Sequence, residues 1–284
     1  MKINVAKSAG FCFGVKRAIR IALDAATSGS EIEMLGDIVH NEDVVRDIQS
    51  AGIRKVRYLA RNRKKILLVR AHGIPLRILR KARSLGYAII DATCPMVKEI
   101  HKIAIGMEGK GRKVIVIGDK SHDEVKGIVG HLKYPPLVID SLENIAIGKI
   151  KKIKRAAVVV QSTQNIKKVK QIFGTLKRYI KDLKLFNTVC TTTGAKQKEI
   201  RNMPLKNQLM IIIGSKTSAN TRRLYEISKS LNKKSYWVQS EKNLRKSWFK
   251  GVKSVGIHAG ASTPDYVTQS IIGRIKQLTA HSRR

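Results

Sequence analysis

The sequence predicts an α/β fold built from parallel sheets, and three observations support this prediction. Short apolar segments, polar loops and amphipathic segments follow one another repeatedly along the 284 residues. Nearly every residue suited to chemistry follows directly after an apolar segment, where parallel strands present their carboxyl ends at one sheet edge. Cys12, Cys94 and Cys190 fall in successive thirds of the chain. We therefore expect three lobes that surround a centre where the three thiolates meet.

The first lobe is expected over residues 1–95. Residues 15–26 carry apolar side chains at helical spacing, and Pro75 opens a helix that Gly86 ends. The apolar run 87–90 is typical of a buried strand. The expected strands are 2–5, 33–35, 65–69 and 87–90, and the expected helices are 15–26, 44–50 and 75–85.

The second and third lobes are expected over residues 96–190 and 191–284. Apolar runs that end in glycine or hydroxyl-rich turns indicate their strands, and a periodicity near 3.6 residues indicates their helices. A basic tail, 280–284, is expected to fray. The expected strands are 113–117, 137–139, 156–160, 208–213, 235–238 and 254–257, with 185–189 leading into Cys190, and the expected helices are 96–107, 166–180, 196–203, 222–231 and 264–278.

The formal net charge of +37 is compatible with nucleic-acid binding, which we keep as the alternative function. The basic residues are spread along the chain and aromatics make up only 5%, so we favour a solvated basic surface and expect no nucleic-acid partner. No apolar run approaches the length of a membrane span, and the first residues lack the apolar core of a secretory signal. The odd number of cysteines argues against a disulfide framework and for a reducing cytoplasm.

The three cysteines leave several kinds of site open. Three thiolates do not complete a tetrahedral zinc site, but they can hold three irons of a four-iron cluster and leave the fourth iron open to substrate. Three separate cysteines that act as small apolar residues are about equally compatible with the spacing, because the C-x₂-C pattern of ferredoxins is absent. Zinc is a third and weaker choice.

Acid–base and anion-binding candidates occupy the loops after the strands. His122 and Glu124 lie two residues apart, and Glu124 could donate a proton if burial raised its pKa. His40 and His72 also follow strands. A solvated turn explains each histidine taken alone, but three histidines at corresponding edges favour an anion pocket.

Two loops rich in glycine and hydroxyl groups suit a phosphate. Ser218 and Asn220 stand where a loop runs into a helix, and Ser262 stands in a similar loop before Pro264. Simple capping of a helix by Ser218 or Ser262 is the plainer explanation of either loop alone. Together with the histidines, the two loops favour a diphosphate, and a phosphate-ester transferase that uses Glu124 is a further hypothesis.

These motifs, in this order, resemble the 4-hydroxy-3-methylbut-2-enyl diphosphate reductase family over nearly the whole chain. Members of that family catalyse the last step of the non-mevalonate isoprenoid pathway. The resemblance rests on Gly10-Phe11-Cys12, His40-Asn41, Ala71-His72-Gly73, Asp91-Ala92-Thr93-Cys94-Pro95, Gly118-Asp119-Lys120 with His122 and Glu124, Gln161-Ser162-Thr163, Asn187-Thr188-Val189-Cys190, Gly214-Ser215-Lys216 with Ser218 and Asn220, and Gly260-Ala261-Ser262.

The resemblance implies three α/β lobes in a pseudo-threefold cloverleaf around one central 4Fe–4S cluster. Cys12, Cys94 and Cys190 would ligate three irons, and Glu124 would supply a proton. An allylic diphosphate would lose its hydroxyl as water with two electrons and two protons, and ferredoxin or flavodoxin would donate the electrons. The residues implied in substrate binding are His40, His72, His122, Ser162, Thr163, Ser218, Asn220 and Ser262, with Ser162 or Thr163 helping to place the proton.

Four positions depart from the pattern of that family. Asp123 stands where proline is usual, which predicts a less rigid loop between His122 and Glu124. The other departures are Ser162 for threonine, Ala219 for a second serine and Lys196 for a frequent arginine. None of them removes an expected cluster ligand or the expected acid.

Overall fold

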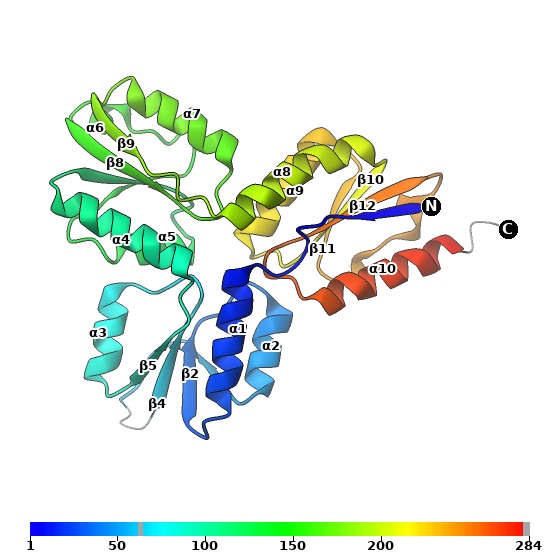
Figure 1. Cartoon of the computed structure of the whole chain (residues 1–284), viewed down its shortest axis with the longest axis horizontal. Helices are drawn as coiled ribbons and strands as arrows, with labels where there is room; N and C mark the ends of the chain where they lie inside the picture. The colour runs from blue at the N-terminus through cyan, green and yellow to red at the C-terminus, as the bar shows by residue number, and fades with distance from the viewer. Residues whose placement is uncertain (62–64, 281–284) are drawn as a thin grey trace. The chain divides into compact units, whose positions relative to one another are not determined.

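The structure, a computed structural model, describes residues 1–61 and 65–280, and within these it contains three four-stranded sheets (Figure 1). Every pair of neighbouring strands is parallel. The predicted α/β fold with three parallel-sheet lobes is therefore confirmed. Sheet A contains β1 (Lys2–Val5), β10 (Leu209–Ile213), β11 (Ser235–Val238) and β12 (Ser254–Ala259); sheet B contains β2 (Glu31–Leu35), β3 (Arg54–Val56), β4 (Lys65–Val69) and β5 (Ala88–Asp91); sheet C contains β6 (Lys113–Ile117), β7 (Leu137–Ile139), β8 (Arg155–Val160) and β9 (Asp182–Leu185).

The three sheets share one strand order. It runs β3-β2-β4-β5 in sheet B, β7-β6-β8-β9 in sheet C and β11-β10-β12-β1 in sheet A. In sheet A the chain's first strand takes the edge position that the last strand of the lobe takes in the other two sheets. The sequence placed 2–5 in the first lobe, whereas β1 pairs with β12. The lobe limits at residues 95 and 190 remain a prediction.

By its internal packing the chain divides into two compact units. Unit 1 comprises Met1–Lys16, Val39–Arg46 and the segment from Thr191 onward, and it contains sheet A. Unit 2 comprises Arg17–Ile38 and Asp47–Cys190, and it contains sheets B and C.

The helices follow the strands as expected, with a few additions. The sequence did not indicate β3, α5 or α6, each of which is short. It also placed the start of α8 five residues too late, because the threonines and glycine of 191–194 have low helix propensity. The helices are α1 (Phe13–Ala26), α2 (Glu42–Ser50), α3 (Leu76–Ser84), α4 (Pro95–Gly109), α5 (Asp123–Val129), α6 (Ile147–Ile150), α7 (Ile166–Lys177), α8 (Thr191–Lys206), α9 (Ala219–Leu231) and α10 (Asp265–Ala280), with 3₁₀ turns at Glu241–Asn243 and Lys246–Phe249.

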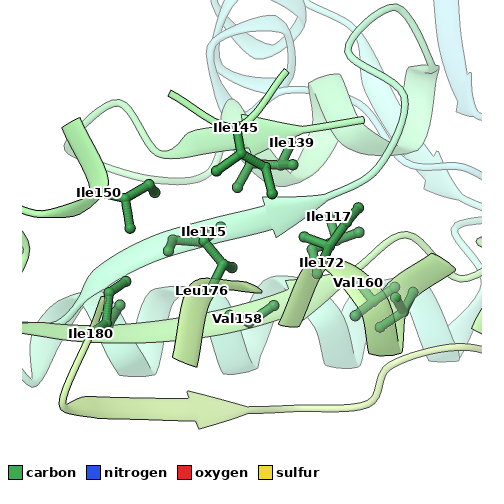
Figure 2. Close-up of a cluster of buried hydrophobic side chains, with 12 residues drawn as sticks. Ile115, Ile117, Ile139, Ile145, Ile150, Val158, Val160, Ile172, Leu176 and Ile180 are labelled. Carbon is green, nitrogen blue, oxygen red and sulfur yellow. The ribbon is translucent and has the colours of Figure 1, made fainter. Parts of the chain in front are cut away.

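Sheet C shows how the cores are built. Its central strand β6 is apolar on both faces, as a strand covered on both sides requires. Ile115 and Ile117 pack with α7 on one face, where Figure 2 shows the labelled side chains turned toward one another. Val114 and Val116 pack with α4 and α5 on the other face. This packing fixes the carboxyl ends of β6 and β8, from which the candidate acid–base loop leaves.

Sheet B contains a buried carboxylate at Glu33. The side chain is 3% exposed, and it accepts hydrogen bonds from Tyr87 Oη at 2.6 Å, from Lys65 Nζ at 2.9 Å and from Arg54. Burial raises the pKa of Glu33, but the hydrogen bonds from these three groups outweigh it and lower the pKa from 4.5 to about 2. The folded state therefore holds this carboxylate ionised at a pH where the unfolded state is protonated.

Replacing Glu33 with glutamine is expected to remove part of the acid sensitivity of the fold. A lowered carboxyl pKa stabilises the folded state above pH 4.5, and this stabilisation is lost as the pH falls toward 2. Over that window the wild type should lose about 2–3 kcal/mol more of its free energy of unfolding than Glu33→Gln. Urea unfolding at stepped pH measures this difference. Glu31→Gln, at an exposed position of the same strand, should keep the wild-type slope.

Two further expectations concern membrane-spanning segments and the basic tail. Among residues 1–61 and 65–280, no helix has both the length and the apolar character that crossing a membrane requires. The basic tail expected over 280–284 lies outside the described residues from position 281 onward.

Candidate functional site

The three cysteines occupy equivalent places in the three sheets. Each follows the edge strand of its own sheet, namely β1, β5 or β9, and each directly precedes the first residue of a long helix. Cys12 precedes α1, Cys94 precedes α4 and Cys190 precedes α8. Since the amino end of a helix carries a partial positive charge, each position stabilises a thiolate or another anion.

The backbone anchors each cysteine in the same way. The N–H of Cys12 donates to Ala261 O at 3.0 Å, that of Cys94 to Ala71 O at 2.9 Å and that of Cys190 to Ser162 O at 2.9 Å. Each acceptor is the second residue after the neighbouring strand β12, β4 or β8. One backbone device thus sets a thiol at the carboxyl edge of every sheet. The sequence shows no repeat that would reveal it.

This donor set fits an iron–sulfur cluster. All three cysteines are thiols, and each is partly exposed rather than buried in a core. A small apolar residue would be buried, so the exposure argues against a packing role. Soft sulfur ligands placed before the amino ends of helices match what iron–sulfur clusters require of a protein. Cys12 lies in unit 1, and Cys94 and Cys190 lie in unit 2.

Glu124, the expected proton donor, and Ser162 are hydrogen-bonded to each other inside unit 2. Glu124 lies in the first turn of α5 and is 1% exposed. Its Oε1 accepts the Ser162 backbone N–H at 2.6 Å, and its Oε2 accepts the Ser162 hydroxyl at 2.6 Å. Burial raises the pKa of Glu124, while both bonds from Ser162 oppose that rise. A carboxyl with a raised pKa holds a proton that it can deliver.

His122 and His72 come together beside this acid, also in unit 2. His122 caps α5, and its Nδ1 accepts the backbone N–H of Glu124 at 3.2 Å. Nε2 is therefore the ring's N–H donor. The rings of His72 and His122 meet edge to face with centroids 5.3 Å apart. Thr163 directly follows Ser162 in the same loop. Its hydroxyl accepts a hydrogen bond from Gln161 Nε2 at 3.0 Å.

Unit 1 brings together the other predicted anion-binding residues. Ser262 Oγ donates to His40 O at 3.0 Å, which joins the loops after β12 and before α2. Ser218 caps α9 by accepting the Thr221 N–H at 3.3 Å, so the plainer capping role is present. Asn220 is 4% exposed, and among the described residues its buried Nδ2 has no hydrogen-bond partner. A buried amide with an open donor favours an additional anionic ligand.

Gly214 stands at the start of the loop that leads to Ser218, where a side chain would not fit. Gly214 directly follows β10 and has φ +144°, a conformation that L side chains rarely adopt. A Cβ there would lie 2.7 Å from the hydroxyl oxygens of Thr221 and Thr263. Both threonines lie in or beside the hydroxyl-rich loops that the sequence indicated, but the sequence assigned neither of them a role.

Lys196 is a buried cation to which the sequence assigned no role. It is fully buried in α8, and its ammonium donates to Gly10 O at 2.9 Å, to Ala259 O at 3.3 Å and to Ser8 O. Burial lowers its pKa to about 8, while Cys12 and Glu199 raise it, so the ammonium is charged at neutral pH. Three carbonyl oxygens suit its three N–H donors. Lys196 thus fastens the loop that leads to Cys12.

Replacing Lys196 with methionine is expected to lower the free energy of unfolding by about 2–4 kcal/mol, because buried carbonyls lose their donor. Urea denaturation followed by circular dichroism measures the loss. Lys198→Met, on the exposed side of the same helix, should leave stability within about 0.5 kcal/mol of wild type. Equal stability of the two variants would contradict the fastening role.

The chain is similar to known proteins over nearly its whole length. The sequence model described as LytB protein matches residues 3–276. The 4-hydroxy-3-methylbut-2-enyl diphosphate reductase of Aquifex aeolicus (strain VF5) is 38% identical over 97% of this chain and 96% of its own length. The protein of the same name from Campylobacter concisus (strain 13826) is 38% identical over 98% of this chain and 100% of its own length.

Two solved structures share the fold. A structure of (E)-4-hydroxy-3-methyl-but-2-enyl diphosphate reductase, the terminal enzyme of the non-mevalonate pathway, covers 98% of this chain and 100% of its own, with a TM-score of 0.72 and 37% identity. The reductase structure from Plasmodium falciparum covers 97% of this chain and 88% of its own, with a TM-score of 0.90 and 24% identity. The second supports the fold alone. On this evidence the chain belongs to the LytB protein family.

Proposed function

We propose that this chain reduces (E)-4-hydroxy-3-methylbut-2-enyl diphosphate to isopentenyl and dimethylallyl diphosphate. The main support for this proposal is that the chain matches the LytB protein family over nearly its full length and that its relatives are named 4-hydroxy-3-methylbut-2-enyl diphosphate reductase. The allylic C–O bond breaks, two electrons enter, one proton leaves with the hydroxyl as water, and a second proton adds to either end of the allylic system. Family membership indicates an iron–sulfur enzyme with a small diphosphate substrate.

Cys12, Cys94 and Cys190 would hold one 4Fe–4S cluster by three of its irons. When bound, the cluster would supply electrons and an open, Lewis-acidic iron for the substrate oxygen. Their equivalent positions at three sheet edges support this ligand set. Ferredoxin or flavodoxin would deliver the electrons, and the net charge of +37 favours an acidic donor of this kind. The thiol chemistry suits the reducing cytoplasm.

Glu124 supplies a proton in this proposal. Its burial favours the neutral acid, and Ser162 holds both of its carboxyl oxygens. When Glu124 is protonated, its O–H can donate to Ser162 Oγ and free the serine hydrogen for the substrate. The proton can thus pass along the pair toward the leaving hydroxyl, which departs more easily as water.

Each unit contains residues that are expected to bind the diphosphate. His72 and His122, with Nε2–H of His122 as a donor, serve in unit 2. In unit 1 the expected residues are Ser218, Asn220, Ser262 and His40, of which Asn220 has an open N–H. Ser162 and Thr163 complete the set near the hydroxyl end of the substrate. Hydrogen bonds from N–H and O–H groups to a diphosphate are charge-assisted and therefore stronger than bonds between neutral groups.

Anaerobic reconstitution tests the proposal. The chain is loaded with iron and sulfide, and oxidation of a reduced dye is followed with and without the hydroxylated C5 diphosphate. We expect about four irons per chain, broad visible absorption and substrate-dependent oxidation that yields both C5 products. A fully loaded protein that oxidises no dye with this substrate would overturn the proposal.

A further inference from the structure

An ion pair in unit 2 joins the two loops that carry His72 and His122. Arg70 directly follows β4, and Asp123 is the first residue of α5. Arg70 Nη1 lies 2.7 Å from Asp123 Oδ2, and the two side chains are only 14% and 22% exposed. An ion pair this poorly exposed is screened less by salt than a surface pair, and it is costly to break from one side.

The guanidinium of Arg70 is held on more than one side. Its Nε donates to Gly73 O at 3.3 Å, which closes the turn around His72. Gly36, at φ +81°, faces it so closely that a Cβ would lie 2.9 Å from Nη1. The absence of a side chain at Gly36 therefore gives the guanidinium its space. The contacts of Arg70 with Gly73 and Gly36 fix the position of Nη1, the nitrogen that donates to Asp123 Oδ2.

The ion pair lies directly next to the predicted substrate-binding groups. His72 is two residues after Arg70, and His122 immediately precedes Asp123. The ring centroids of the two histidines are 5.3 Å apart. His122 Nδ1 is in turn held by the backbone N–H of Glu124. A change in the distance between Arg70 and Asp123 therefore changes the spacing of both rings and the start of α5.

We propose that Arg70 and Asp123 are a positioning pair that sets the spacing of His72 and His122 for the diphosphate. This inference rests on the proposed function and deepens it. At the position of Asp123 the family pattern usually has proline, which fixes the first turn of a helix through its ring. In this chain the ion pair between Arg70 and Asp123 would restrain the start of α5, which a proline ring would otherwise restrain covalently. The loop between His122 and Glu124 is therefore held, although its sequence predicts a looser one.

The backbone would accept proline in place of Asp123. Proline suits the first position of a helix, and it requires an extended residue before it. His122 has φ −70° and ψ 139°, which meets that requirement. Asp123→Pro is thus a variant that removes the ion pair and restores the restraint by another route.

The test measures KM and kcat of the reconstituted enzyme for the hydroxylated C5 diphosphate. Arg70→Met and Asp123→Asn should each raise KM about tenfold and leave kcat within about threefold, because diphosphate binding is loosened and the chemistry is not. The double variant should cost no more than either single one, as a shared interaction requires. Asp123→Pro should recover most of the wild-type KM. Lys126→Met is the matched control, since Lys126 lies 4.0 Å from the same carboxylate but is 56% exposed, and it should change nothing.

A second measurement separates this inference from the proposed function. Binding of inorganic pyrophosphate by calorimetry and amide exchange at 122–125 need no turnover. Weaker binding and faster exchange in both single variants, reversed in Asp123→Pro, would support the pair even if the wild type had no reductase activity. Single variants that match Lys126→Met in KM, pyrophosphate binding and exchange would overturn it, as would a double variant whose effects simply add. If Arg70→Met fails to fold, Asp123→Asn and Asp123→Pro decide the question.

Discussion

Replacing Cys94 with serine is expected to bleach the reconstituted protein and to reduce turnover by roughly 10³-fold or more. The thiol stands at the amino end of α4, and the backbone of Ala71 anchors it at the edge of sheet B. A serine hydroxyl keeps the size and the anchor, but it is a hard and weakly acidic ligand that holds iron poorly. Iron content, visible absorption and dye oxidation, measured on the same sample, report the loss.

The control for this change is Ile105→Ser. It introduces the same residue on the same helix at an exposed position, and it should keep both colour and activity. A Cys94→Ser protein that retained full iron and activity would rule out Cys94 as a ligand. If the chain were a nucleic-acid-binding protein, Cys94→Ser would leave its binding to nucleic acid unchanged. None of the relatives named above supports that alternative.

Replacing Glu124 with glutamine is expected to lower kcat by about 10²–10⁴-fold while the colour remains. Glutamine is isosteric and can still contact Ser162, but it has no proton to give. Because burial raises the pKa of Glu124, wild-type kcat should fall as the pH rises through that pKa. In Glu124→Gln this dependence should disappear from the residual rate. The pH profile of kcat therefore separates loss of the acid from general damage.

Stability provides an independent reading of the same group. A raised carboxyl pKa means that the folded state keeps a proton which the unfolded state releases, so stability falls as the pH rises above 4.5. Glu124→Gln should remove this part of the pH dependence, and Glu99→Gln, at an exposed position of α4, should not. Activity of Glu124→Gln within tenfold of wild type would show that another group delivers the proton.

Much of the fold could be predicted because local patterns determine it. Apolar runs such as 113–117 and 156–160 are unmistakable as buried strands, and the polar residues after them necessarily gather at a sheet edge. The hydrogen bond between Glu124 and Ser162 is compatible with that rule, although the sequence linked the two residues only through the family resemblance. Their roles, in contrast, came from the order of motifs along the chain, because one histidine or one serine loop carries little information.

What the sequence did not reveal depends on pairings between distant residues. Nothing in Lys2–Val5 indicates that this strand pairs with β12 rather than with a strand of the first lobe. The carbonyl cage around Lys196 draws on three separate segments. The ion pair of Asp123 requires Arg70, 53 positions away. The sequence shows that Asp123 replaces the proline usual in the family. It does not show that Arg70 pairs with Asp123.

The pairing of β1 with β12 has a consequence for biosynthesis. As the ribosome extends the chain from its amino end, β2–β5 and β6–β9 can each assemble as soon as their own residues emerge. The strand that leads to Cys12, although made first, has no sheet to join until the residues of β12 leave the exit tunnel. Sheet A, and with it the segment that leads to Cys12, is therefore expected to be completed after sheets B and C.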